Sequence, residues 1–271
     1  MLQLMYITNV PEVAAIAQQC GVDRIFVDLE TIGKKERQGG MNTVQSAHTV
    51  EDVQGLRKVV SNSRLLIRSN PVHKYFKQEI EAIIKAGADI IMLPYFKTVY
   101  EVQFFLSLVD GRAKTCLLFE TKEAVEQADT ILDLDGIDEA YIGLNDLHLS
   151  YGLKFMFELL TNGCVDQLCE KFKAKRLAYG FGGLARLNQG MLPAGKIIAE
   201  HYRLGSSMAI LSRTFCNVDL SNSVEAIRAT FYAGLQEIRN LEYELLQNGN
   251  PEKYAVNRAE IQQIVNQIVN E

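Results

Sequence analysis

The sequence predicts a (β/α)8 TIM barrel with extra helices at its carboxyl end. Short apolar runs alternate with amphipathic segments along the chain. The length of 271 residues is close to the roughly 250 residues typical of this barrel. Strict alternation of strands and helices favours a closed parallel barrel over an open sheet. With 48% hydrophobic residues and no linker, we expect one barrel domain over residues 1–271, in which 221–271 form a helical extension.

Eight apolar runs of strand length are present, and each is followed by turn-forming or polar residues. These strand candidates are Gln3–Thr8, Arg24–Asp28, Leu65–Arg68, Ile90–Leu93, Thr115–Phe119, Ala140–Ile142, Ala178–Phe181 and Ser207–Leu211. The segments between them repeat apolar residues every three or four positions, as helices packed on a sheet do. The helix candidates are Glu12–Gln19, Val50–Val60, Lys77–Ala86, Val99–Leu108, Lys122–Leu132, Gly163–Lys173 and Pro193–Tyr202.

The carboxyl-terminal segment exceeds what one barrel helix requires. A long apolar stripe runs from Ser223 to about Gln247, a break follows at Asn248–Pro251, and a second, short helix is expected after it. One interpretation is an eighth barrel helix with a docked tail. The other is contact between subunits. We expect a homo-oligomer in either case.

Composition narrows the class of partner. The chain has 28 basic and 33 acidic residues, a net charge of −5, which makes nucleic acid and anionic membranes unexpected partners. Its amino terminus shows no basic start or cleavage site of a signal peptide, and no apolar stretch has the length of a membrane span. The five cysteines form no CxxC pair, which suggests reduced thiols in the cytoplasm.

Polar residues collect where the predicted strands end. In a parallel barrel these ends share one mouth, which carries the active site. Glu120 and Asp146 end the fifth and sixth strands, and two carboxylates there suit a hard cation such as Mg²⁺ or Mn²⁺. The other residues expected at the mouth are Asp28, Glu30, Arg68, Pro94, Leu144, Asn145, Gly182, Gly183, Arg186 and Arg213.

The segments around these residues resemble the HpcH/HpaI aldolase and citrate lyase beta-subunit family. LLFETKEAVEQADTILDLDGIDEAYIGLNDLHLSYG is similar to its metal-binding half, and DRIFVDLE, LLIRSNP and AGADIIMLPYFKTVYEV are similar to its second, third and fourth strands. The resemblance extends from about Gly21 to Gly152. It implies that Glu120 and Asp146 hold the divalent cation and that Arg68 binds an enolate oxygen or a substrate carboxylate.

The sequence also departs from the family's aldolases. Asp28-Leu29-Glu30 resembles the citrate lyase form, and no histidine follows it closely, whereas the aldolases carry a histidine that supports a base. We predict Glu30 as the general base, because it shares a strand face with Asp28. Alternatives are a structural Glu30 paired with Lys34 or Arg68, a metal-bound hydroxide, His73 or His148.

The segment after the seventh strand is rich in glycine and arginine. Gly180, Gly182 and Gly183 free the backbone for close approach of a ligand. Arg186 and Arg213 would flank a phosphorylated or otherwise anionic substrate, since barrels often bind phosphate at these loops. The alternative is that both arginines are solvated or paired with helix carboxylates.

Together these features predict a metal-dependent carbon–carbon lyase of the class II aldolase type. Its expected substrate is a small carboxylic acid, such as the 2-keto acid pyruvate, which reacts through a metal-stabilised enolate. The alternatives are a citryl- or malyl-CoA-type acyl lyase, and a non-catalytic barrel that binds a metal and an acid.

Overall fold

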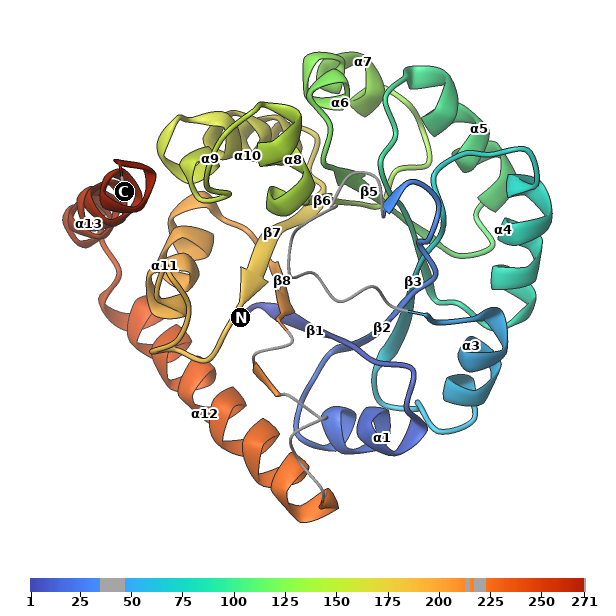
Figure 1. Ribbon diagram of the computed structural model, residues 1–271, viewed down its shortest axis with the longest axis horizontal. Helices are drawn as coiled ribbons and strands as arrows, with labels where there is room; N and C mark the ends of the chain where they lie inside the picture. Colours follow the sequence, from blue (N-terminus) through green and yellow to red (C-terminus); the bar gives the residue numbers. More distant parts are fainter. Residues whose placement is uncertain (35–46, 213–214, 217–222, 271) are drawn as a thin grey trace.

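The computed structural model describes residues 1–34, 47–212, 215–216 and 223–270. Its eight parallel strands pair in chain order, and β8 returns to pair with β1, so that the barrel closes (Figure 1). The TIM-barrel prediction is therefore confirmed. The strands are β1 Gln3–Ile7, β2 Arg24–Asp28, β3 Arg64–Arg68, β4 Ile90–Leu93, β5 Lys114–Phe119, β6 Glu139–Ile142, β7 Ala178–Leu184 and β8 Met208–Leu211.

Helices surround the barrel (Figure 1). Capping boxes start two of them, at Thr49 with Asp52 and at Thr98 with Glu101. The helices are α1 Pro11–Gln19, α3 Val50–Arg57, α4 Phe76–Lys85, α5 Val99–Val109, α6 Lys122–Glu126, α7 Ala128–Leu132, α8 Leu144–Ser150, α9 Glu158–Thr161, α10 Cys164–Ala174, α11 Ala194–Leu204, α12 Val224–Asn248 and α13 Pro251–Asn270.

Two parts of the helix prediction are wrong. The single helix expected over Lys122–Leu132 is divided at Gln127, whose backbone leaves the helical conformation between α6 and α7. The helices α8 and α9 were not predicted, because segments of 7 and 4 residues are too short to show a helical period.

The period of two along each strand decides what lies inside the barrel. Phe26, Leu66, Cys116, Leu118 and Tyr141 all belong to one buried cluster that fills the interior. Residues two positions before or after them share their strand face. Charged side chains therefore point toward the barrel axis at both ends of the strands, and the apolar interior cluster lies between them.

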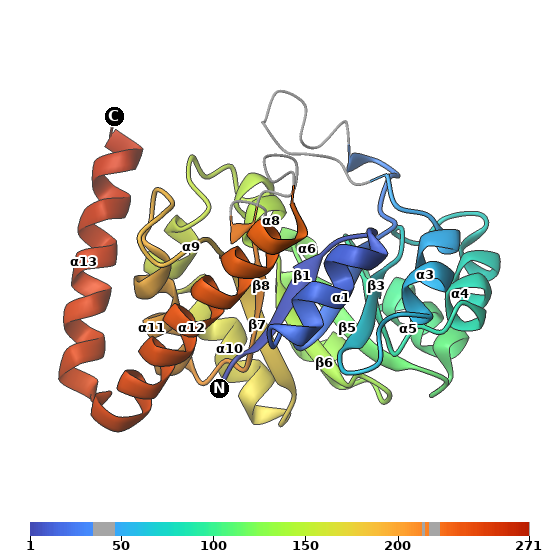
Figure 2. The ribbon, with the colours of Figure 1, turned by 90° about the horizontal axis from the view of Figure 1, so that it is seen from below.

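The two carboxyl-terminal helices have different roles. Helix α12 packs against both α1 and α11 and so fills the eighth place in the ring of helices. Helix α13 packs on α11 and α9 outside that ring, where Figure 2 shows it at the edge of the molecule. Its 20 residues exceed the short helix that the sequence predicts.

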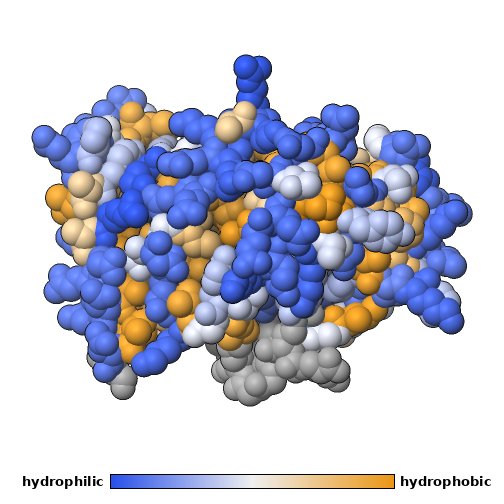
Figure 3. Space-filling view, turned by 90° about the horizontal axis from the view of Figure 1, so that it is seen from above, coloured by the Kyte–Doolittle hydropathy of each residue, from blue (hydrophilic) through white to orange (hydrophobic). Residues whose placement is uncertain are grey.

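Within the described ranges, every helix is too short or too polar to span a bilayer. Figure 3 shows a largely hydrophilic face with scattered apolar patches.

Candidate active site

A cavity of about 340 Å³ opens at the carboxyl ends of the strands. Its charged lining residues are Asp28, Lys34, Arg68, Glu120 and Asp146. Asp28 and Arg68 are the last residues of β2 and β3, and Glu120 directly follows β5. Lys34 and Asp146 lie in the segments after β2 and β6. The structure thus brings together most of the residues that the sequence places at the mouth, and adds Lys34.

Arg68 and Asp28 form a bidentate ion pair across β3 and β2. Arg68 Nε donates to Asp28 Oδ1 at 2.8 Å, and Arg68 Nη2 donates to Oδ2 at 2.7 Å. Burial opposes ionisation of Asp28, but the charges and hydrogen bonds of Arg68 and Lys34 prevail and hold the pKa of its carboxyl well below the usual range. Burial likewise opposes the charge on Arg68, yet the carboxylates of Asp28, Glu30 and Glu120 raise its pKa. Both groups are therefore ionised at neutral pH.

Lys34 is a charged residue of the cavity lining that the sequence analysis named only as a possible partner of Glu30. Its Nζ lies 2.7 Å from Asp28 Oδ2 and 3.6 Å from Glu30 Oε2, and the residue is only 5% exposed. Glu30 lies behind it: fully buried, 3.5 Å from Arg68 Nε, and not among the residues that line the cavity. This arrangement gives Glu30 contacts with two cations, and it leaves Lys34 and Arg68 facing the space that a substrate would fill.

Glu120 is held in a defined orientation by its surroundings. The backbone N–H of Tyr95 donates to Glu120 Oε1 at 2.9 Å, from a residue in the left-handed region with φ of 47°. Gly143 lies against the same carboxylate: a Cβ on Gly143 would be 2.8 Å from Glu120 Oε2. The glycine therefore leaves room for the carboxylate at the cavity wall.

Asp146 lies in the first turn of α8, directly after β6, and is 6% exposed. Leu144 and Asn145 precede it, and all three line the cavity. Within the described ranges, no cluster of three or more His, Cys, Asp or Glu residues is arranged to hold a metal ion. Glu120 and Asp146 could thus supply two oxygen-donor residues, and water and substrate would have to complete the coordination of a cation.

The wall formed by β7 depends on Tyr141, which the sequence analysis did not single out. The register of β7 against β8 shifts between Gly180 and Gly183. At this irregularity Tyr141 Oη donates to Gly182 O at 2.6 Å and accepts from Ile210 N at 2.9 Å. Gly182 and Gly183 line the cavity as expected. Gly180 has a packing role instead, because a Cβ there would lie 2.3 Å from Met208 O.

Other expected residues lie elsewhere. Pro94 is buried beside Tyr95 and does not line the cavity. Arg186 is also outside the cavity lining, and its Nη2 lies 3.8 Å from Glu237 Oε1 on α12. Arg213 lies outside the described residues.

The histidine candidates are engaged with other groups. His73 Nε2 is 2.7 Å from Glu79 Oε2, and His148 Nδ1 is 3.2 Å from Leu144 O. The structure also brings a distant histidine to the end of β2, where Asp28 N donates to His48 Nδ1 at 3.1 Å. Its separation of 20 residues from Asp28 hid this contact from motif analysis.

Solved structures with this architecture share little sequence with the chain. An HpcH/HpaI aldolase from Desulfitobacterium hafniense DCB-2 aligns over 92% of this chain and 95% of its own, with a TM-score of 0.62 and 17% identity. An HpcH/HpaI aldolase/citrate lyase family protein from Burkholderia cenocepacia J2315 aligns over 88% and 95%, with a TM-score of 0.63 and 15% identity. The citrate synthase SbnG aligns over 84% and 94%, with a TM-score of 0.61 and 17% identity. Such low identities support the fold alone.

The family itself is shown by sequence. No curated protein matches the chain. A family model, in contrast, matches residues 3–158, which include Asp28, Arg68, Glu120 and Asp146. This match covers more than half of the chain and agrees with the order of motifs described above. The chain belongs to the HpcH/HpaI aldolase/citrate lyase family.

Proposed function

We propose that the chain is a divalent-metal-dependent carbon–carbon lyase, which cleaves or forms a bond to a 2-keto acid through an enolate. The observation that carries this proposal is the shared cavity of Glu120, Asp146 and Arg68. Its position at the carboxyl ends of the strands is where barrel enzymes carry their active sites. Membership of a family of aldolases and lyases supports the same reaction class.

The charges at the mouth fit a doubly charged cation. Among the described residues, the carboxylates of Asp28, Glu30, Glu120 and Asp146 face the cations of Lys34 and Arg68. Asp28 and Glu30 contact these cations directly, and Glu120 and Asp146 add two further carboxylates to the lining of the same cavity. Held by these two residues, Mg²⁺ or Mn²⁺ would supply a Lewis acid that polarises the keto group.

Arg68 is suited to stabilise negative charge on the substrate. Asp28 occupies Nε and Nη2 of the guanidinium, and Nη1 remains to donate toward the cavity. A donor fixed in this way stabilises charge as it develops, without reorganisation during the reaction. Its target would be the enolate oxygen or the substrate carboxylate.

Lys34 is better placed than Glu30 to transfer the proton of the reacting hydroxyl. When the carbon–carbon bond forms, its ammonium would give a proton to the oxygen that becomes the hydroxyl, and in cleavage that proton would return to it. Glu30, behind the cavity wall, would position Lys34 and Arg68. The proposal therefore replaces Glu30 by Lys34 as the acid–base group.

A second proposal, an acyl lyase acting on a thioester, rests on Asp28-Leu29-Glu30. This reaction would also form an enolate at the mouth of the barrel. Binding of Mn²⁺ and oxalate therefore tests the metal-dependent enolate site that the two proposals share. Oxalate stands in for the pyruvate enolate. We expect it to bind wild-type protein only with Mn²⁺ present, and expect Glu120→Gln to lose this binding. Oxalate binding unaffected by EDTA would contradict the proposal.

Substrate assays separate the remaining possibilities. Exchange of the pyruvate methyl protons that depends on Mn²⁺ would support enolisation at this site. Cleavage of 4-hydroxy-2-keto acids would indicate an aldolase, and cleavage of a 3-hydroxyacyl thioester an acyl lyase. Oxalate binding with no exchange and no cleavage of either class would favour a barrel that binds metal and acid without catalysis.

A further inference from the structure

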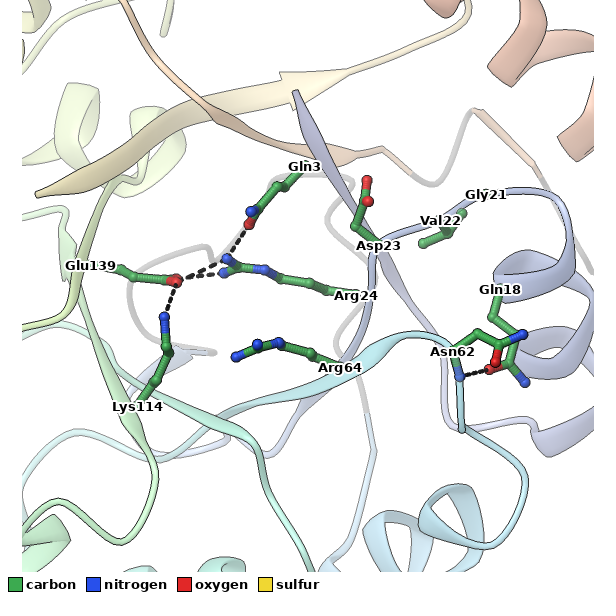
Figure 4. Close-up of a pocket in the computed structure, with 10 residues that line it drawn as sticks. All are labelled: Gln3, Gln18, Gly21, Val22, Asp23, Arg24, Asn62, Arg64, Lys114 and Glu139. Atoms are coloured by element: carbon green, nitrogen blue, oxygen red, sulfur yellow. Dashed lines mark hydrogen bonds and ion pairs between the residues drawn. The ribbon is translucent and has the colours of Figure 1, made fainter. Parts of the chain in front are cut away.

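A second polar cavity, of about 380 Å³, lies at the opposite end of the barrel. Four of its charged residues occupy the first positions of strands: Arg24 of β2, Arg64 of β3, Lys114 of β5 and Glu139 of β6. A fifth, Asp23, directly precedes β2. Each of the four strand residues precedes an interior residue by two positions, namely Phe26, Leu66, Cys116 and Tyr141. The strand period therefore directs all four toward the barrel axis. Figure 4 shows their side chains converging there.

Three cations in this floor cavity face one buried carboxylate. Arg24 donates to Glu139 through Nη1 at 2.5 Å and Nη2 at 2.9 Å, and these two residues are 4% and 3% exposed. Lys114 Nζ is 3.9 Å from Glu139 Oε1. The other acid at the rim, Asp23, is already engaged, since it accepts from Leu4 N at 2.8 Å and lies 3.2 Å from Arg239 Nη2.

Arg64 is the cation that the local structure does not account for. Among the described residues, its guanidinium makes no hydrogen bond and no ion pair, although it lines the cavity. It also occupies the position directly opposite Arg24 in the pairing of β2 with β3. Two guanidinium groups at paired positions attract an anion, and the nearby carboxylate of Glu139 is already held by Arg24. A floor that served stability alone would need only Arg24 to neutralise Glu139.

We propose that the floor cavity binds the phosphate group of a small molecule. Arg24, Arg64 and Lys114 outnumber Glu139 and Asp23, so the lining carries a net positive charge that favours an anion. Guanidinium forks bind phosphate oxygens through paired hydrogen bonds. Arg64 and Lys114 would supply most of this contact, because Glu139 occupies Arg24. The volume suits a small ligand, near the lower limit of ordinary binding pockets. This site is separate from the mouth and independent of the lyase proposal.

Calorimetric titration with inorganic phosphate tests the site directly, at an ionic strength held constant with chloride. We expect saturable binding of one phosphate per wild-type chain. Arg64→Gln removes an exposed cation without disturbing the buried pair, and should weaken binding by at least about tenfold, the effect of one charge-assisted hydrogen bond. Lys114→Gln should also weaken it. Lys58→Gln is the matched control, since Lys58 is an exposed cation at the end of α3 and does not line the cavity.

The outcomes are distinguishable. Equal phosphate binding by wild-type protein and Arg64→Gln would overturn the proposal, as would binding lost in Arg68→Lys instead, because the phosphate would then occupy the mouth. Absence of saturable binding by wild-type protein, or preference for succinate over phosphate, would also overturn it. Glycerol phosphate identifies the source of the group: tighter binding than inorganic phosphate indicates a phosphate ester, and weaker binding indicates the free ion.

Discussion

Arg68 and Asp28 occupy directly paired positions of β3 and β2, and the Arg68 guanidinium grips both oxygens of the Asp28 carboxylate. The Oδ2 atom of the same carboxylate also accepts a hydrogen bond from Lys34 Nζ. One acid thus fixes two cations at the mouth, opposite the pair of carboxylates proposed to hold a metal. This division of charge underlies the first two predictions.

Replacing Arg68 by lysine should lower turnover while leaving the metal site intact. Lysine keeps the charge but loses the planar fork that Asp28 holds, so the donor to the developing negative charge is misplaced. We expect the barrier to rise by about 2–4 kcal/mol. Steady-state kinetics measures this loss, and a Mn²⁺ titration should give an affinity close to that of wild type, because the proposed ligands are Glu120 and Asp146. Unchanged turnover would remove Arg68 from the mechanism.

Lys34→Gln and Glu30→Gln separate proton transfer from positioning. Lys34→Gln should abolish cleavage yet still exchange the pyruvate methyl protons, since water can take the methyl proton while the metal site and Arg68 stabilise the enolate. Glu30→Gln should retain measurable cleavage at a reduced rate, with a changed pH profile, because Glu30 acts through Lys34 and Arg68. The opposite pattern, with cleavage lost only in Glu30→Gln, would restore Glu30 as the general base.

The contrast between expected and observed site residues has a physical cause. Alternation along a strand determines which side chains share a face, so Asp28, Arg68 and Glu120 could be assigned to the mouth from sequence. Lys34 lies beyond the end of β2, where no period constrains its direction. Arg186 follows the end of β7, a strand whose register is irregular. Its position shortly after the strand therefore did not predict that its side chain would contact Glu237 on α12.

Gly143→Ala should weaken metal binding through Glu120. The added methyl group would lie 2.8 Å from Glu120 Oε2, so the carboxylate has to move. Gly143 has a φ of −84°, outside the left-handed region that L-residues disfavour. The effect therefore comes from the contacts of the added Cβ, which would also lie 3.0 Å from Glu120 Cβ and 3.2 Å from Leu118 Cδ1. We expect the Mn²⁺ affinity to fall by about 10- to 100-fold, as when groups that support metal ligands are changed. Titration with Mn²⁺ monitored by electron paramagnetic resonance measures it.

Gly55→Ala provides the matched control for that substitution. Gly55 lies within α3 and has open space where a Cβ would be placed. The change should leave Mn²⁺ affinity unaltered and stabilise the fold by roughly 0.5–1 kcal/mol, because alanine favours the helix. Equal Mn²⁺ affinity in Gly143→Ala and Gly55→Ala would show that Glu120 does not bind the metal.

His201 should make the fold sensitive to mild acid. It is fully buried on α11, stacks on Phe181 with ring centroids 3.9 Å apart, and contacts Ser206 Oγ through Nδ1 at 2.8 Å. Burial lowers the pKa of its imidazole to about 3, against about 6.5 in the unfolded chain.

Between these two pKa values the unfolded chain binds a proton that the folded chain does not. Stability is therefore complete above the unfolded pKa and falls with decreasing pH, by up to ~1.4 kcal/mol per pH unit from this group. Urea denaturation at a series of pH values should show this slope in wild type and a shallower one in His201→Gln; equal slopes would mean that other groups set the acid sensitivity.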